Sequence, residues 1–251
     1  MKDYTIAEEY TLPSLGKIYD VKVNPEVKLR SMTTEDEMKR LAPSEKGFKL
    51  LCEIIDDCLV DDPGISSYDM CLGDQQFLLH KLRVVTYGAD YPLVTKCQYC
   101  GSSTKQIVDL DSLAVRTYTE EIEKYKEFDL PVSKKHIKLK LQTPRILDDV
   151  QSRKRELMKK NPSMLGEPAF LFTLQAIIDE VDGEKLGPAE LEQFVRKLPM
   201  KDTNYIVKKS EKLNESIGVD LHFDANCTVC RLDYPATFRT TKDFFGPDID
   251  E

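Results

Sequence analysis

The sequence has no tryptophan, only three histidines, and no apolar run long enough to span a membrane. A Ser or Cys nucleophile therefore has no evident histidine base beside it. The chain also lacks the common phosphate-binding, dinucleotide-binding, zinc-protease and α/β-hydrolase motifs, which are G-x-x-x-x-G-K-[ST], G-x-G-x-x-G, H-E-x-x-H and G-x-S-x-G. These absences predict a protein that is not an enzyme, has no membrane partner and serves as a scaffold.

No secretory leader is evident, because the start Met1-Lys2-Asp3-Tyr4 is charged and lacks an apolar segment. The seven cysteines are an odd number, and most of them fall in two C-x-x-C pairs. Such usage fits metal-bound thiolates in a reducing compartment better than a disulfide framework. We therefore expect the protein in the cytoplasm of the cell that makes it.

Acidic residues outnumber basic ones, since 44 Asp and Glu against 36 Lys and Arg give a net charge of −8. This balance argues against nucleic acid as the main partner, because an acidic surface repels a phosphate backbone. The most basic segment, residues 153–160, has no interleaved aromatic side chain and is interpreted as a solvated helix face. At 251 residues the chain is long enough to bury a sizeable core.

Two C-x-x-C motifs carry the strongest chemical signal, Cys97-Gln98-Tyr99-Cys100 and Cys227-Thr228-Val229-Cys230. Two thiolates from one tight turn can reach the same ion, and two such turns supply the four sulfurs of a closed structural zinc site. Gly101 can take the positive φ that such a turn needs, and strand-like runs flank each pair. We predict one structural Zn²⁺ per chain in a zinc ribbon with residues 101–226 inserted between its knuckles. The predicted ligands are Cys97, Cys100, Cys227 and Cys230.

Two other interpretations of these motifs stay open, namely two unrelated reduced pairs or one redox-active C-x-x-C. Redox motifs usually open a helix after a buried strand. Pro92 precedes the first pair and the polar turn residues 101–104 follow it, which does not favour a helix. Cys52 and Cys58 fall on the apolar face of a predicted helix and are interpreted as small hydrophobic fillers rather than ligands.

Hydrophobic periodicity predicts an α+β fold with a mainly helical body, short β-hairpins and a zinc-ribbon lobe formed by the two distant C-x-x-C knuckles. Four parts are expected. They are residues 1–92, an N-terminal hairpin and helices; 93–117 with 218–240, the zinc-ribbon lobe; 118–217, an inserted hairpin and helical bundle; and 241–251, a C-terminal tail. The tail contains Phe244 and Phe245 and is expected to dock on its own body or on a neighbour.

Local patterns in the N-terminal part make two specific predictions. Apolar and polar residues alternate over 21–23 and 27–29, which predicts a hairpin around Asn24-Pro25. Thr34 is followed three residues later by Glu37, which predicts a capping box at the start of a short helix.

Three further elements are predicted from periodicity. A helix capped by Gly73-Asp74 is expected to bury an apolar face and to direct three polar side chains elsewhere: His80, Lys81 and Arg83. With no partner motif, the histidine is interpreted as satisfied or solvated. The apolar stretch 169–178 predicts one central core helix, and alternation over 219–225 predicts one strand that leads into the second cysteine pair.

Short motifs in a fixed order resemble one viral family. They are Leu12-Pro13-Ser14, M-T-x-x-D-E within 28–37, R-x-x-x-Y-G within 82–91, and C-x-x-C-G at 97–101. This order is similar to that of the baseplate hub protein family of contractile-tailed, T-even-like bacteriophages, over about residues 10–115 plus the second cysteine pair. The resemblance implies a structural or assembly protein of the phage tail, made in the host cytoplasm, that contacts other tail or baseplate hub proteins. A homo-oligomer is compatible with it.

Alternatives to this function stay open, because residues 118–216 carry no motif of that family. One is a nucleic-acid-binding zinc-ribbon protein, although the basic residues around the knuckles are limited to Lys96, Lys105 and Arg231. Another is an enzyme with a structural zinc. A third is a tail assembly chaperone that is not retained in the virion.

Overall fold

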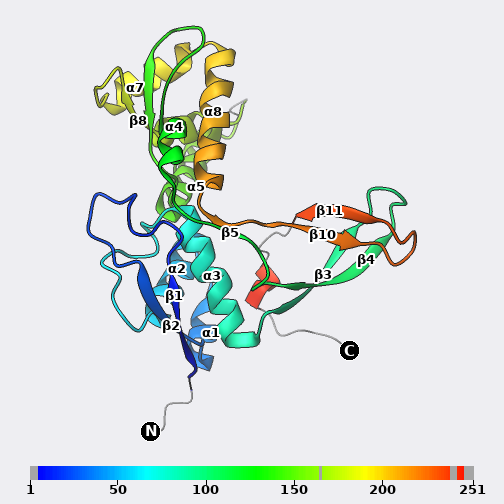
Figure 1. The fold of residues 1–251 in the computed structure, drawn as a ribbon. Coiled ribbons are helices and arrows are strands. Elements are labelled where there is room, and N and C mark those ends of the chain that lie inside the picture. The colour runs from blue at the N-terminus through cyan, green and yellow to red at the C-terminus, as the bar shows by residue number, and fades with distance from the viewer. Residues whose placement is uncertain (1–4, 164–165, 238–241, 246–251) are drawn as a thin grey trace.

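The structure is a computed structural model that describes residues 5–163, 166–237 and 242–245. Within these residues the fold is α+β, with eight α-helices and short antiparallel sheets. Figure 1 shows three lobes: an N-terminal lobe of β1, β2 and α1–α3, an insert lobe from α4 to α8, and a cysteine lobe of β3, β4, β10 and β11 that extends to one side. None of the described helices is both long enough and apolar enough to cross a membrane.

The N-terminal lobe packs one hairpin against three helices. Its elements are β1 (Ala7–Thr11), β2 (Glu26–Arg30), α1 (Thr34–Arg40), α2 (Gly47–Cys58) and α3 (Leu72–Tyr87). Aliphatic side chains at helical spacing on α2 and α3 meet the inward side chains of β2. The fully buried centre of this core includes Leu12, Leu29, Ile55, Leu78 and Leu82.

The predicted partner of strand β2 is wrong. β2 pairs antiparallel with β1, so that Tyr10 lies opposite Val27, and residues 21–23 form no strand. The loop between the strands closes through a 2.8 Å hydrogen bond from the Leu12 N–H to the Pro25 carbonyl. Alternation of apolar and polar residues indicates that a segment is extended but does not identify its partner strand. Here the partner of β2 is β1, which precedes it by a longer loop than the predicted hairpin would have.

The capping box of α1 begins one residue earlier than predicted. Thr33 is the N-cap residue, and its hydroxyl accepts a hydrogen bond from the Asp36 N–H at 3.4 Å. The Asp36 carboxylate in turn accepts from the Thr33 N–H at 2.7 Å. Because Thr33 is the N-cap, Asp36 rather than Glu37 is the third helical residue of the box, and its carboxylate also pairs with Arg30 at 2.7 Å.

The polar side of α3 is buried, in contrast to the prediction for two of its residues. His80 and Arg83 are buried, whereas Lys81 is half-buried and forms an ion pair with Asp111. The short helix η2 (Lys242–Phe245) covers this side, and the Phe244 ring centroid lies 5.2 Å from that of His80. The described part of the predicted tail therefore docks on its own body, while residues 238–241 and 246–251 lie outside the described ranges.

The insert lobe combines a three-stranded sheet with helices. Its strands are β6 (Glu127–Asp129), β7 (His136–Leu139) and β8 (Ile178–Val181), in the order β6-β7-β8. Its helices are η1 (Glu120–Ile122), α4 (Glu123–Lys126), α5 (Pro144–Lys160), α6 (Pro168–Ile177), α7 (Pro188–Lys197) and α8 (Met200–Glu215). The β6-β7 hairpin was predicted. β8 was not, because the apolar run 169–178 has no internal break that separates a helix from a strand.

Helix α5 connects the insert lobe to the N-terminal lobe. The buried Asp148 carboxylate accepts hydrogen bonds from the Lys49 N–H at 2.9 Å and the Tyr68 hydroxyl at 3.2 Å. Arg145 pairs with Asp69, with one N–O distance of 2.5 Å. These contacts fix α5 against the start of α2 and the loop before α3.

The chain enters and leaves the insert lobe at one place, where β5 (Val115–Arg116) pairs with β9 (Gly218–Val219). The predicted single strand 219–225 is interrupted here, so that β10 (His222–Asn226) begins separately. Asp220 and Leu221 separate the two strands, and the Asp220 N–H donates to the Ala114 carbonyl at 2.7 Å, next to the β5-β9 pairing.

Candidate metal centre

The cysteine lobe is made of two hairpins that each carry one C-x-x-C at the turn. β3 (Asp90–Lys96) leads into Cys97, and β4 (Ser103–Asp109) leaves the first turn. β10 leads into Cys227, and β11 (Asp233–Thr237) leaves the second turn. Both hairpins point in the same direction in Figure 1, away from the helices.

The two turns share the same backbone hydrogen bonds. In the first, the Cys97 N–H donates to the Ser102 carbonyl at 2.9 Å, and the Gly101 N–H donates to the Cys97 carbonyl at 2.9 Å. In the second, the Cys227 N–H donates to the Leu232 carbonyl at 3.1 Å, and the Arg231 N–H donates to the Cys227 carbonyl at 2.8 Å. Two segments that are far apart in sequence therefore adopt one knuckle geometry.

This geometry requires a left-handed residue four positions after the first cysteine. Gly101 occupies that position in the first knuckle with a φ of 73°, as predicted, whereas Arg231 occupies it in the second with a φ of 60°. A non-glycine residue in this region is strained. The surrounding hairpin therefore holds Arg231 in a conformation that its own sequence does not favour.

The structure brings all four cysteines together. Their sulfur atoms lie within 4.8 Å of one another. Two of the distances join different knuckles: 3.7 Å between the Cys97 and Cys230 sulfurs, and 3.6 Å between those of Cys100 and Cys227. Cys97 and Cys227 are buried, Cys230 is half-buried and Cys100 is exposed.

Four thiolates at this spacing fit a tetrahedral ion. A Zn–S bond of about 2.3 Å places the sulfurs of a regular tetrahedron about 3.8 Å apart. The two short cross-knuckle distances are close to that value. A centre with four protein sulfurs is closed and has no open position for a substrate, which is typical of structural rather than catalytic zinc.

Ser102 is a polar neighbour of this cluster that sequence reasoning did not single out. Its hydroxyl oxygen lies 2.8 Å from the Cys100 sulfur and 3.4 Å from the Cys227 sulfur. Together with the N–H groups of Cys230 and Val229, it lowers the pKa of Cys227 to about 6. A hydroxyl two residues after a C-x-x-C can donate to a thiolate, which is the signal that could have identified it.

The neighbouring sulfurs disfavour simultaneous ionisation. For Cys230 the Leu232 N–H lowers the pKa, but loss of solvent and the sulfurs of the other cysteines outweigh it and raise the value to about 12. A cation between the sulfurs would relieve this repulsion, because it favours every thiolate at once.

A hydroxyl bridge holds the two hairpins side by side. The Tyr234 hydroxyl on β11 lies 2.6 Å from the Thr95 hydroxyl on β3 and 3.2 Å from that of Thr104 on β4. The Gln106 amide donates to the Asn226 carbonyl at 2.8 Å. These contacts place the knuckles opposite each other through protein groups alone.

The remaining cysteines lie elsewhere. Cys52 and Cys58 are buried in the N-terminal lobe, and burial raises the pKa of each thiol to about 12. Their interpretation as apolar fillers agrees with this environment. Cys71 is also buried, and its sulfur accepts a hydrogen bond from the Asp74 N–H as the N-cap of α3.

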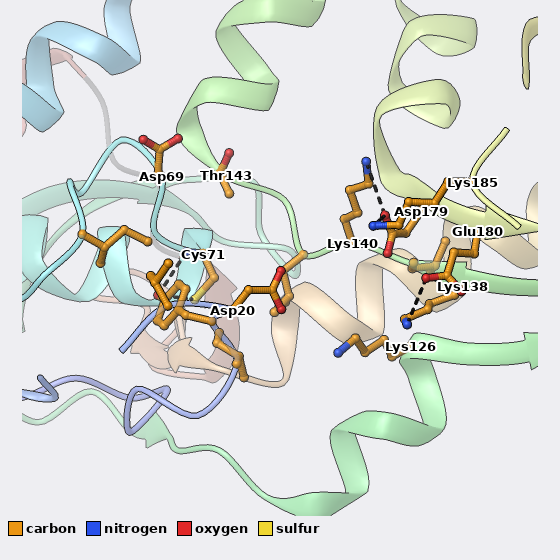
Figure 2. Close-up of a pocket in the computed structure, with 16 residues that line it drawn as sticks. Asp20, Asp69, Cys71, Lys126, Lys138, Lys140, Thr143, Asp179, Glu180 and Lys185 are labelled. Carbon is orange, nitrogen blue, oxygen red and sulfur yellow. Dashed lines mark hydrogen bonds and ion pairs between the residues drawn. The ribbon is translucent and has the colours of Figure 1, made fainter. Parts of the chain in front are cut away.

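A separate hollow of about 470 Å³ lies between the N-terminal and insert lobes (Figure 2). Charged side chains of both signs line it, and several pair with one another. Lys138 lies 3.2 Å from Glu180, and Lys140 lies 3.6 Å from Asp179. Most of these charged side chains therefore already form ion pairs with each other. The hollow presents no group of side chains of like charge that could together bind an oppositely charged ligand.

Comparison with known proteins agrees with the motif order in the sequence. The model of the family described as T4 bacteriophage base plate protein matches residues 4–246. Searches of curated proteins and of solved structures return no match. The family match spans all three lobes, including both cysteine knuckles, and on this basis the chain belongs to the T4 bacteriophage base plate protein family.

Proposed function

We propose that this protein is a structural or assembly protein of the baseplate hub in a T4-like phage tail. The family match over residues 4–246 is the observation that carries this proposal, and the order of the hub-like motifs supports the assignment to the hub. The protein acts through contacts with other tail proteins and catalyses no reaction. It is made in the host cytoplasm, where tails assemble.

Within this role, Cys97, Cys100, Cys227 and Cys230 bind one structural Zn²⁺. The clustered sulfurs and the matched knuckles support this assignment. Zinc suits a site of four thiolates because it is soft enough for sulfur and accepts tetrahedral geometry without redox change. The two hairpins then form a zinc ribbon.

The zinc ribbon defines the proposed division of the chain. Residues 93–117 with 218–240 form the zinc-bearing unit, and 118–217 form an insertion between its two halves. Residues 1–92 and the tail 241–251 complete the molecule. The ion links the two ends of the insertion, so its loss should loosen the knuckles while the hydroxyl bridge and the helices remain.

The metal assignment is tested by elemental analysis of purified protein. We expect one zinc per chain in the wild type, and loss of zinc in Cys97→Ser and Cys230→Ser. The variants should become sensitive to protease in the cysteine lobe while their far-UV circular dichroism remains largely helical. Cys52→Ala is the matched control, because it removes a buried thiol outside the cluster and should keep the zinc. Wild-type protein that is fully stable without metal would refute the assignment.

The place in the particle is tested with an affinity-tagged chain expressed during infection. Crosslinking followed by mass spectrometry should recover baseplate hub proteins in tail intermediates. Proteomics of finished particles then separates a retained subunit from an assembly factor that leaves. Recovery of only sheath, tube or fibre proteins would contradict a function in the hub, while leaving the zinc assignment intact.

A further inference from the structure

The hairpin of β3 and β4 has an outer face that no described part of the chain covers. Side chains on β4 alternate strictly: Thr104 and Val108 are buried against the molecule, whereas Ser103, Lys105, Ile107 and Asp109 are exposed. On β3 the residues paired with that exposed set are Lys96, Val94, Pro92 and Asp90. One face of the hairpin thus consists of four cross-strand pairs directed to solvent.

The centre of this outer face is formed by two cross-strand pairs, Pro92 with Ile107 and Val94 with Lys105, so three of its four side chains are apolar. Ile107 is 73% exposed and pairs with Pro92, and the adjacent Val94 is 66% exposed. Exposed β-branched side chains such as Ile107 and Val94 are suited to packing against another sheet. In Figure 1 the hairpin extends away from the helices of the N-terminal and insert lobes.

The two ends of the outer face carry opposite charges. Asp90 pairs with Asp109 at the end nearest the helices, and Lys96 lies at the end next to the cysteine knuckle. Both Asp90 and Lys96 are exposed on the same strand and the same face. Lys105 adds a second positive charge on the half of the face nearer the knuckle, and Asp90 and Asp109 lie at the opposite end. Such a face is complementary to its own copy when that copy is reversed.

We propose that the outer face of β3 and β4 binds the same face of a second copy of this chain. The two copies are related by a two-fold axis that lies in the interface and is perpendicular to the strands. This axis places Lys96 of each copy over Asp90 of the other, and Val94 over Pro92. A two-fold axis parallel to the strands would instead place Asp90 of each copy over Asp109 of the other, so that like charges meet. The charge pattern therefore selects an antiparallel face-to-face dimer.

The size of the face sets the expected strength. Two seven-residue strands cover less than the area of a standard stable interface, so the dimer belongs to the weak or transient class. The net charge of −8 on each chain further opposes association at low salt. The measurement therefore needs near-physiological ionic strength and concentrations from micromolar to near-millimolar.

The test is sedimentation velocity on the full-length, zinc-loaded protein. Wild type should show a reversible monomer–dimer equilibrium, and Ile107→Asp should raise the dimer Kd by at least about tenfold. Met38→Asp is the control, because Met38 is 70% exposed on α1, outside the proposed face, and its replacement should leave the Kd unchanged. Circular dichroism and zinc content verify that each variant is folded.

A charge exchange tests the two-fold arrangement itself. Lys96→Asp and Asp90→Lys should each weaken the dimer several-fold, and the double variant should restore it, because the exchanged ends again match in a reversed copy. Wild type that stays monomeric throughout, or a dimer unaffected by Ile107→Asp, overturns the proposal. A double variant no better than the single variants overturns the two-fold register. Each of these outcomes leaves the baseplate and zinc assignments untouched.

Discussion

At the scale of single residues, Asp36 shows how one carboxylate organises the start of a helix. It completes the capping box with Thr33 and pairs with Arg30, whose guanidinium also donates to the Asp57 carbonyl at 2.9 Å. Burial alone would raise the pKa of Asp36, but Arg30 and the Thr33 N–H and hydroxyl outweigh it and hold the value at about 2. The charged form of Asp36 therefore stabilises the folded state.

Asp36→Asn is expected to lower the free energy of unfolding at pH 7 by about 1–2 kcal/mol. The folded pKa lies below the ordinary value of 3.8, so this stabilisation is present above that value and is lost as the pH falls towards about 2. Urea unfolding of the wild type and of Asp36→Asn, measured from pH 7 down towards about 2, should show that the difference in their free energies of unfolding becomes smaller as the pH falls. Glu35→Gln, an exposed acid in the same helical turn, is the control and should change little. An equal loss from Asp36→Asn at every pH would contradict the role of its charge.

At the scale of elements, η2 packs on α3 through Phe244 and covers His80. Phe244 is fully buried, and its ring centroid lies 5.2 Å from His80 and 5.4 Å from Tyr91. The Arg83 guanidinium lies 4.8 Å from the centroid of the Tyr87 ring and 5.7 Å from that of the Tyr91 ring, which in turn contacts Phe244. The described end of the chain thus completes the core of the N-terminal lobe rather than forming a free tail.

Phe244→Ala is expected to destabilise the protein by about 3 kcal/mol or more, because a buried aromatic ring is lost and the polar side of α3 is opened to water. Thermal unfolding and hydrogen exchange of α3 amides measure the effect. Phe170→Ala removes the same side chain from a site on α6 that is 45% exposed, and we expect it to cost less than about 1 kcal/mol. Similar losses in the two variants would show that η2 does not contribute to the core.

At the scale of the whole molecule, the lobes meet where the chain returns from the insertion. The backbones of Gly73 in α3 and Gly218 in β9 touch there, so a Cβ on Gly218 would lie 2.7 Å from the Gly73 Cα. Gly218 also has a φ of 109°, which L side chains rarely adopt. This crossing positions β9 and β10, and through them the second cysteine knuckle.

Gly218→Ala is expected to destabilise the protein by at least about 2 kcal/mol, because both the contact and the backbone conformation exclude a methyl group. We also expect weaker zinc retention against a chelator, since the second knuckle depends on this crossing. Gly47→Ala is the matched control, because no atom lies within 4 Å of the added Cβ. It should be neutral or slightly stabilising at the first position of α2. Unaltered stability and zinc retention in Gly218→Ala would show that the crossing is not a constraint.

The parts of the site that could be predicted were those encoded by short, local patterns. The two C-x-x-C motifs and Gly101 identify a thiolate-rich turn within a few residues, because knuckle geometry is local. Arg231 and Ser102 were missed. The positive φ of Arg231 is imposed by its hairpin, and the Ser102 hydroxyl contacts the sulfur of Cys227, which belongs to the other knuckle.

The sequence by itself determined the family, the α+β class, the positions of the four cysteines of the two knuckles, and the β6-β7 hairpin. Only the tertiary structure decided that β1 pairs with β2, that β8 joins the insert sheet, that His80 and Arg83 are buried, and that the two sulfur pairs meet. Periodicity records which side of a segment is apolar, and it contains no information on what covers that side. That depends on contacts between segments far apart in the chain, such as the β5-β9 pairing on either side of the insertion.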